Sequence, residues 1–236
     1  MAAFLLLTFC LQGCAPLDAP PLDAEDAAEA EEDSSSGVEF PLYSIDGEAQ
    51  RGLFYAVCES EHAVAYVSAH AISKEAAQRL LDCFEETIRP GLTYPSSSEG
   101  TKLAVLLTHM AGETYGYTPF PIPEQGPVVC LNALYAKDLA YILAHEYQHL
   151  CAHEACAAGG TFLSEETDEL LSDMFCELLF PSLAQSHALL SEERGQAARE
   201  RIDEWGEDAL MHVYAFLREG YSEEKMLLAM EKRVSG

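Results

Sequence analysis

Residues 138–173 read DLAYILAHEYQHLCAHEACAAGGTFLSEETDELLSD, and this stretch predicts two helices separated by a glycine pair. The first helix is expected over 138–153, with Asp138 as its N-terminal cap. Gly159-Gly160 breaks the chain, and the second helix is expected over 164–180, before a proline. Both helices carry polar residues at helical spacing on otherwise apolar faces, so the same stretch also holds the candidate chemistry.

The first helix contains His145-Glu146-Tyr147-Gln148-His149. Residues four apart lie on one helical face, so both imidazoles can point at one metal ion. Glu146 lies about 100° around the helix from His145. It can therefore reach a water at the metal without binding the metal itself. Neutral imidazoles are good zinc donors, and a neighbouring carboxylate can accept a proton from water.

The second helix offers a third ligand. Glu169 and Asp173 are again four residues apart, so one carboxylate can reach the metal while the other orients a ligand histidine. Leu170, Leu171 and Met174 turn the face of Glu169 and Asp173 toward the core, which favours Glu169. The alternatives in the same helix are Glu165, Glu166 and Asp168, of which Glu165 is the serious rival. Glu165 lies near the N-terminus of the helix, where the helix dipole favours an acid in any case.

The pattern His-Glu-x-x-His, nineteen residues, Glu-x-x-Ser-Asp resembles the thermolysin-like gluzincin metallopeptidases. DELLSDMF resembles that family's Asn-Glu-x-x-Ser-Asp helix, with Asp168 in place of the asparagine. LDCFEETIRP, KLAVLLTHM and TYGYTPF, followed by the strand and helix after Val128, are similar to hyicolysin-type bacterial peptidases in order and character. The resemblance covers roughly residues 75–180. It implies a zincin-like fold with one zinc ion bound by His145, His149 and Glu169, with Glu146 as general base and with Asp173 orienting His145.

The resemblance also implies a zinc-dependent endopeptidase. Zinc bound by two histidines and one glutamate keeps an open position for water and lowers the pKa of that water toward about 7. Glu146 would take the proton as the water attacks a peptide carbonyl, and would deliver it to the leaving amine. These families supply a further histidine or tyrosine for the oxyanion. The candidates in this chain are His187, His212, Tyr214 and Tyr221, of which we favour His212 and Tyr214.

The remaining pattern is typical of an α+β protein, with a small N-terminal mixed β-sheet and helices followed by a helical C-terminal half. A single domain is expected over 38–236, β-rich in 38–135 and helical in 136–236. Strands are expected at 38–45, 52–59, 62–69, 102–108 and 128–131, a long loop at 111–127, and further helices at 74–89 (capped by Ser73), 186–204, 207–219 and 222–233.

The N-terminal segment has the character of an export signal. Residues 1–13 are apolar and uncharged, and Leu11-Gln12-Gly13-Cys14 resembles the bacterial lipobox, in which the cysteine is lipidated. The rest of 14–37 lacks aromatic, β-branched and basic residues, which predicts a disordered acidic tether. We therefore expect an exported protein that is anchored by lipid to the bacterial cell envelope and contacts the membrane through that anchor alone.

Charge restricts the partners. Forty acidic and thirteen basic residues give a formal net charge of −27, which argues against nucleic acid as a ligand. Residues 138–193 contain eleven acids and no lysine or arginine. A negative cleft of this kind favours a metal cation and basic or neutral peptides. The expected partner is a peptide or protein substrate.

Other interpretations remain open at this stage. A non-catalytic surface lipoprotein with a zincin fold could bind host or envelope proteins, and a cytoplasmic protein could carry the motif by chance. His153 lies about 12 Å from His145 along the helix and is too far to share its metal. Cys151 and Cys156 suggest either a local disulfide or, with His153, a structural zinc site. The remaining body cysteines (Cys58, Cys83, Cys130 and Cys176) are candidate disulfide partners or buried hydrophobes, and His62, His70 and His109 are expected to be structural or exposed.

Overall fold

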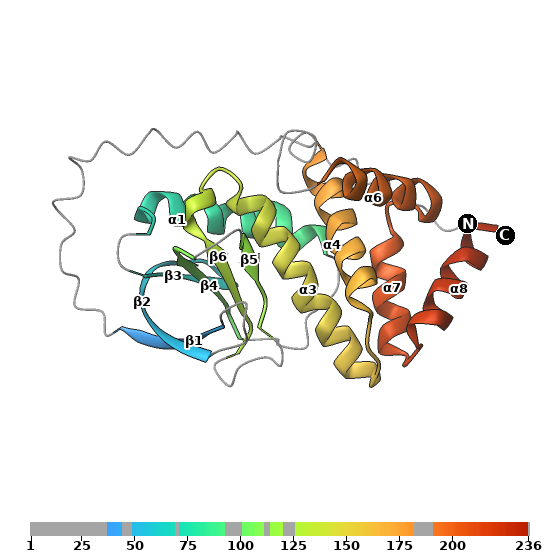
Figure 1. Cartoon of the computed structure of the whole chain (residues 1–236), viewed down its shortest axis with the longest axis horizontal. Helices are drawn as coiled ribbons and strands as arrows, with labels where there is room; N and C mark the ends of the chain where they lie inside the picture. Colours follow the sequence, from blue (N-terminus) through green and yellow to red (C-terminus); the bar gives the residue numbers. More distant parts are fainter. Residues whose placement is uncertain are drawn as a thin grey trace, which may run out of the picture.

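The structure is a computed structural model of the chain, and it describes residues 37–43, 49–68, 71–92, 101–110, 114–119, 126–181 and 191–235. The expected signal, Cys14 and nearly all of the tether lie outside the described residues, as do His70 and His187. Within the described part, a curled mixed sheet comes first and a helical half follows (Figure 1). The expected α+β architecture is confirmed.

The described strands form one sheet in the order β1-β2-β3-β4-β6-β5. β3 pairs in parallel with β4, and β4 in parallel with β6, whereas the other neighbours are antiparallel. A register shift in β2 between Ala56 and Cys58 marks a bulge, which increases the local twist. The bounds are β1 (Val38–Tyr43), β2 (Ala49–Glu59), β3 (Ala63–Val67), β4 (Leu103–Thr108), β5 (Gly116–Tyr117) and β6 (Val128–Asn132).

The central strands β4 and β6 are buried on both faces. In β4, Val105 and Leu107 join the large core shared with the helices, whereas Leu106 points to the opposite face. There it meets Phe40 of β1 and Phe54 of β2, because these two strands curl over that face (Figure 1). Continuous apolar runs are typical of strands covered on both sides, as the sequence indicated for residues 102–108.

The helices begin and end largely where the sequence predicts. Ser73 caps α1 by accepting from the backbone N–H of Ala76, and Gly220 follows α7 with φ +80°. The bounds are α1 (Lys74–Cys83), the π-helical η2 (Phe84–Ile88), α2 (Arg89–Gly91), the 3-10 turn η3 (Ala133–Tyr135), α3 (Leu139–Gly159), α4 (Glu165–Leu179), α6 (Glu192–Trp205), α7 (Ala209–Arg218) and α8 (Glu223–Ser235).

Two expectations about element boundaries are wrong. α3 continues six residues past His153 because Ala155 and Cys156 are buried, and it ends only where Gly160 adopts φ +64°. Part of the loop expected at 111–127 is the short strand β5, in which Gly116 and Tyr117 pair with β6. Such a short strand forms through its partner and not through its own propensity.

α3 lies between the sheet and the C-terminal helices (Figure 1). α1 packs with it on one face of the sheet, while α4 and α7 cover its other side. Buried polar residues join α3 to α4, since the Ser172 hydroxyl donates to the side-chain oxygen of Gln148. Glu223 of α8 accepts hydrogen bonds from the backbone N–H and the hydroxyl of Ser164, which fixes the start of α4.

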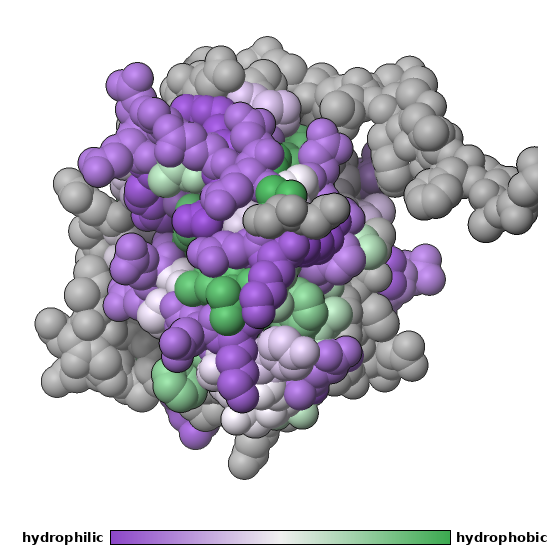
Figure 2. Space-filling model, turned by 90° about the vertical axis from the view of Figure 1, so that its right-hand side faces the viewer, coloured by the Kyte–Doolittle hydropathy of each residue, from purple (hydrophilic) through white to green (hydrophobic). Residues whose placement is uncertain are grey.

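The outer face of the helical half is mainly hydrophilic, with small apolar areas between charged side chains (Figure 2). Met211 on α7 and Leu228 and Val234 on α8 are about half exposed. No helix in the described part of the chain is long and apolar enough to cross a bilayer.

Candidate metal centre

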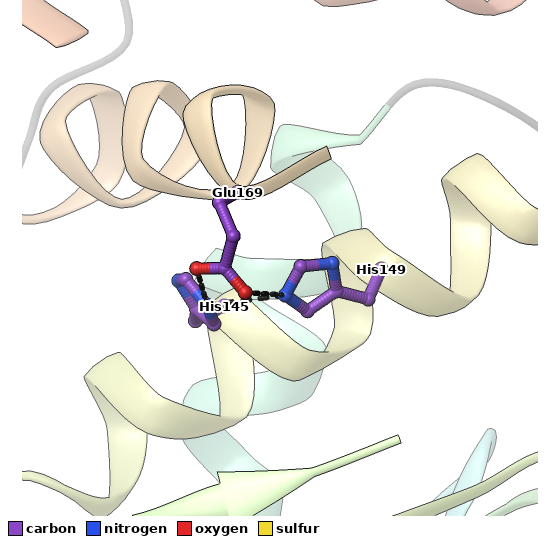
Figure 3. Close-up of side chains that lie close together, drawn as sticks. All are labelled: His145, His149 and Glu169. Carbon is purple, nitrogen blue, oxygen red and sulfur yellow. Dashed lines mark hydrogen bonds and ion pairs between the residues drawn. The ribbon is translucent and has the colours of Figure 1, made fainter. Parts of the chain in front are cut away.

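α3 and α4 bring His145, His149 and Glu169 together (Figure 3). The two Nε2 atoms are 3.1 Å apart. Glu169 points from α4 between the two rings, with Oε2 3.4 Å from Nε2 of His145 and Oε1 3.5 Å from Nε2 of His149. The histidine side chains are only 17% and 12% exposed, whereas that of Glu169 is 38% exposed. The cluster therefore lies at the edge of the interior, within reach of solvent.

The spacing of these three donors fits a zinc ion. Zinc bonds of about 2.05 Å at tetrahedral angles place neighbouring ligand atoms about 3.3 Å apart. The two Nε2 atoms are 3.1 Å apart, and each lies within 3.5 Å of a different oxygen of the Glu169 carboxylate. With one donor atom taken from each residue, all three lie within 4.8 Å of one another. Two imidazole nitrogens and one carboxylate oxygen are also a donor set that zinc prefers. Three protein ligands leave a fourth position for water or substrate.

Asp168 contacts Nδ1 of His149, the ring nitrogen that does not face the cluster. Its Oδ2 lies 2.9 Å from Nδ1 of His149 and 3.2 Å from Nε2 of His153. Burial alone would lower the pKa of His149, but hydrogen bonds to Asp168 and Glu169 raise it to about 10. Burial likewise opposes ionisation of Asp168, yet hydrogen bonds from His149 and His153 bring its pKa below the ordinary value. In the absence of a metal, this side of the cluster holds a protonated imidazole against two carboxylates.

Asp173 lies beside His145, the histidine that the resemblance implies it orients. Its Oδ1 lies 3.6 Å from Nδ1 of His145. Arg194 of α6 donates to both oxygens of this carboxylate, from Nε at 2.8 Å and from Nη2 at 2.9 Å. The same Nη2 lies 2.6 Å from Oε2 of Glu169. Hydrogen bonds with His145 and His149 hold the pKa of Glu169 far below its usual range, so Glu169 is a carboxylate.

Glu146 is buried between α3 and the sheet edge. Thr118, which directly follows β5, has its hydroxyl 3.0 Å from Oε2 of Glu146 and 2.8 Å from the main-chain oxygen of the same residue. Gly116 allows this close packing, because a Cβ there would lie 2.8 Å from Ile142 and 3.1 Å from Cγ of Glu146. Burial raises the pKa of Glu146, against the opposing effects of His145, His149 and Thr118. A raised pKa suits a group that must accept and then release a proton.

The other candidates lie outside this cluster. Glu165 is exposed at the start of α4. His212 pairs with Asp208 at 3.1 Å, on the side of α7 that meets Arg233 of α8. Tyr214 is 1% exposed, and its hydroxyl lies beside Gln148 within the core. Tyr221 stacks on Phe216. An oxyanion-stabilising role for His212 or Tyr214 therefore stays a prediction.

The cysteine alternatives do not agree with the structure. No disulfide joins the six cysteines of the described part. Cys151 and Cys156 lie five residues apart on α3, which places their Cα atoms about 8.7 Å apart, beyond the span of a disulfide. Burial raises their pKa values to about 12 and about 11, which disfavours the thiolate that zinc requires. His153 meets Asp168 instead of completing a cysteine site.

Of the histidines expected to be structural or exposed, the structure describes His62 and His109, and both agree with the expectation. His62 binds Glu85 through its backbone N–H at 2.7 Å and through Nδ1 at 2.8 Å. His109 is exposed. Neither residue belongs to the cluster of His145, His149 and Glu169.

Sequence reasoning missed four contributors. The sequence presents Asp168 only as a rival ligand or as the replacement for the family's asparagine, and His153 only as a distant residue, although their spacing from His149 is visible. Arg194 is the first lysine or arginine after Lys137, so it ends a long stretch without basic residues. This position is the one feature of the sequence that could have drawn attention to it. Nothing in the expected loop distinguished Thr118 as the partner of Glu146.

No protein-family model matches this chain, and no curated protein matches it either.

Proposed function

We propose that the protein is a zinc-dependent endopeptidase with a zincin-like fold. The observation that carries the proposal is the convergence of His145, His149 and Glu169, whose donor atoms lie within 4.8 Å of one another and form a set that zinc prefers. Glu146, whose carboxylate is buried, directly follows His145 in the chain. Together these groups supply what hydrolysis of an amide needs, namely a metal site with an open position and a base beside it.

A zinc ion held by these residues would supply Lewis acidity, which makes water a nucleophile near neutral pH. Glu146 then accepts the proton of the attacking water at its carboxylate and passes it to the nitrogen of the leaving amine. The Thr118 hydroxyl can donate to the ionised carboxylate, and it can accept from the carboxylic acid once Glu146 is protonated. Thr118 therefore keeps the base in place through both states.

The sheet edge supports a peptide as substrate. β5 is the last strand in the described order, so its outer edge faces away from β6. Thr118, at the end of β5, contacts Glu146, and this edge therefore lies beside the proposed base. An extended peptide can pair with a strand edge through main-chain hydrogen bonds, which holds a scissile bond without requiring a particular side chain.

Peptide hydrolysis tests the proposal. Purified full-length protein is incubated with a mixed peptide library, and the products are identified by mass spectrometry before chelation, after chelation and after zinc is restored. We expect internal cleavage that stops on chelation and returns with zinc. Stoichiometric zinc binding without cleavage would instead favour a non-catalytic zincin-fold protein. Failure to bind zinc would remove the proposal altogether.

A further inference from the structure

One carboxylate oxygen contacts two imidazoles on successive turns of α3. Oδ2 of Asp168 lies 2.9 Å from Nδ1 of His149 and 3.2 Å from Nε2 of His153. The Asp168 side chain is 12% exposed and that of His153 is 29% exposed. These are therefore contacts in a largely enclosed setting, where solvent screens them little.

The two helices impose this arrangement. His149 and His153 are four residues apart and share a face of α3, while Asp168 belongs to the first turn of α4, which packs against that face. Ser164 caps α4 by accepting from the backbone N–H of Thr167, and Glu223 of α8 holds Ser164. The backbone that carries Asp168 is thus fixed from two sides.

His153 itself does not face the metal cluster. Its Nε2 meets Asp168, whereas the donors that lie within 4.8 Å of one another belong to His145, His149 and Glu169. If Nε2 of His149 binds the metal, the proton of the neutral imidazole must be on Nδ1, from which it donates to Asp168. His153 can donate from Nε2 to the same oxygen, because a carboxylate oxygen accepts more than one hydrogen bond.

We propose that His153 is a positioning residue of the zinc site, which holds the Asp168 carboxylate so that it fixes the ring of His149. The inference rests on the proposed function, since it assumes that zinc binds at His149. Without His153, Asp168 keeps one of its two imidazole partners and is freer to rotate. The Nδ1–H of His149 then loses a fixed acceptor, and its Nε2 is aligned less well with Nε2 of His145 and with Glu169.

The test is a double-mutant cycle on zinc affinity. The metal-free full chain is titrated with zinc in competition with a chromophoric chelator. His153→Phe keeps a ring but removes both nitrogens, and we expect it to weaken zinc binding about tenfold. His153→Gln retains an N–H donor and should restore affinity to within about twofold of the wild type. Asp168→Ala should weaken binding by about 10- to 100-fold.

The double variant decides between positioning and an independent effect. If His153 acts through Asp168, then adding His153→Phe to Asp168→Ala costs no further affinity. The visible spectrum of bound Co²⁺ should change in His153→Phe and return toward that of the wild type in His153→Gln. His62→Leu, which removes a histidine bonded to Glu85, is the control and should leave both readouts unchanged.

Several outcomes would overturn the inference. Wild-type affinity in a folded His153→Phe variant would do so, as would a full additional loss in the double variant. If His153→Phe does not fold by circular dichroism, His153→Ala supplies the same comparison. Zinc binding by the wild type together with an inert His153 defeats this inference alone, whereas no zinc binding by the wild type defeats the proposed function and the inference with it.

Discussion

The two histidines of the cluster are supported in the same way but with different partners. His145 faces Asp173, whose two oxygens accept from the guanidinium of Arg194. His149 faces Asp168, whose Oδ2 also meets His153. Each imidazole thus contacts an aspartate, and each aspartate in turn contacts a second side chain that carries nitrogen. On one side that group is the guanidinium of Arg194, and on the other it is the imidazole of His153.

The two sides differ in how the aspartate is held. Arginine at the His145 side offers a rigid fork that matches a carboxylate in two places. At the His149 side, by contrast, a single carboxylate oxygen serves two rings one turn apart on the same helix. We therefore expect the His145 side to contribute more to the stability of the fold, and the His149 side to respond more to pH.

Glu169 contacts both His145 and His149, so its removal should have the largest effect on zinc affinity. Structural zinc sites have apparent binding free energies of about 10–16 kcal/mol, or about 2.5–4 kcal/mol for each of four ligands. Glu169→Ala should therefore weaken zinc binding by about 10²- to 10³-fold. Glu165→Ala, on the exposed start of the same helix, is the matched control and should change little. Zinc titration of both folded variants decides the assignment, and loss in the Glu165 variant alone would make it wrong.

Arg194 tests the His145 side. Arg194→Met would leave the carboxylate of Asp173, whose side chain is 3% exposed, without its strongest partner. Because Arg194 itself is 43% exposed, we take less than the full cost of breaking a buried pair and expect the free energy of unfolding to fall by about 2 kcal/mol. Arg51→Met breaks an exposed pair with Glu39 and should cost less than about 0.5 kcal/mol. Urea denaturation of the metal-free protein measures both, and equal losses would contradict a stabilising role of Arg194 at the His145 side.

The pH dependence of zinc binding tests the His149 side. The pKa of His149 is raised to about 10 in the metal-free fold, so zinc must displace a proton at neutral pH. Zinc affinity should therefore rise by up to about tenfold per pH unit between pH 7 and pH 9. Chelator competition at several pH values measures this slope, and an affinity independent of pH would exclude a protonated His149.

The same pKa predicts the opposite trend for the metal-free fold. A raised pKa contributes stability that is fully present below about pH 6.5 and is lost as the pH rises toward 10. Unfolding of the metal-free chain should thus become easier over that range. The zinc-bound protein should lack this contribution, because its His149 is already neutral.

Much of the fold follows from local pattern. The apolar run Leu103–Thr108 and the capped start of α1 at Ser73 are visible in sequence, as is the i, i+4 spacing that brings His145 and His149 to one side of α3. The strand β5 is not visible in the sequence, because its two residues form a strand only through pairing with β6. The extra turns of α3 depend on burial that only tertiary packing provides.

The limits of prediction at the site have the same origin. Glu169 and Asp173 could be selected because helical spacing links them to each other and to an apolar face. Arg194 comes from a helix whose place relative to α4 no local pattern specifies, and Thr118 comes from a segment typical of loops. Both act on residues more than twenty positions away, so only the folded chain brings them to the site.

Glu146→Gln tests the central claim most directly. Glutamine preserves the shape of the side chain and its contact with Thr118 but cannot accept the proton of water. We predict that the variant folds, binds one zinc ion per chain as the wild type does, and hydrolyses the peptide library about 10²- to 10⁴-fold more slowly. Equal rates for the two proteins at equal zinc content would contradict the account.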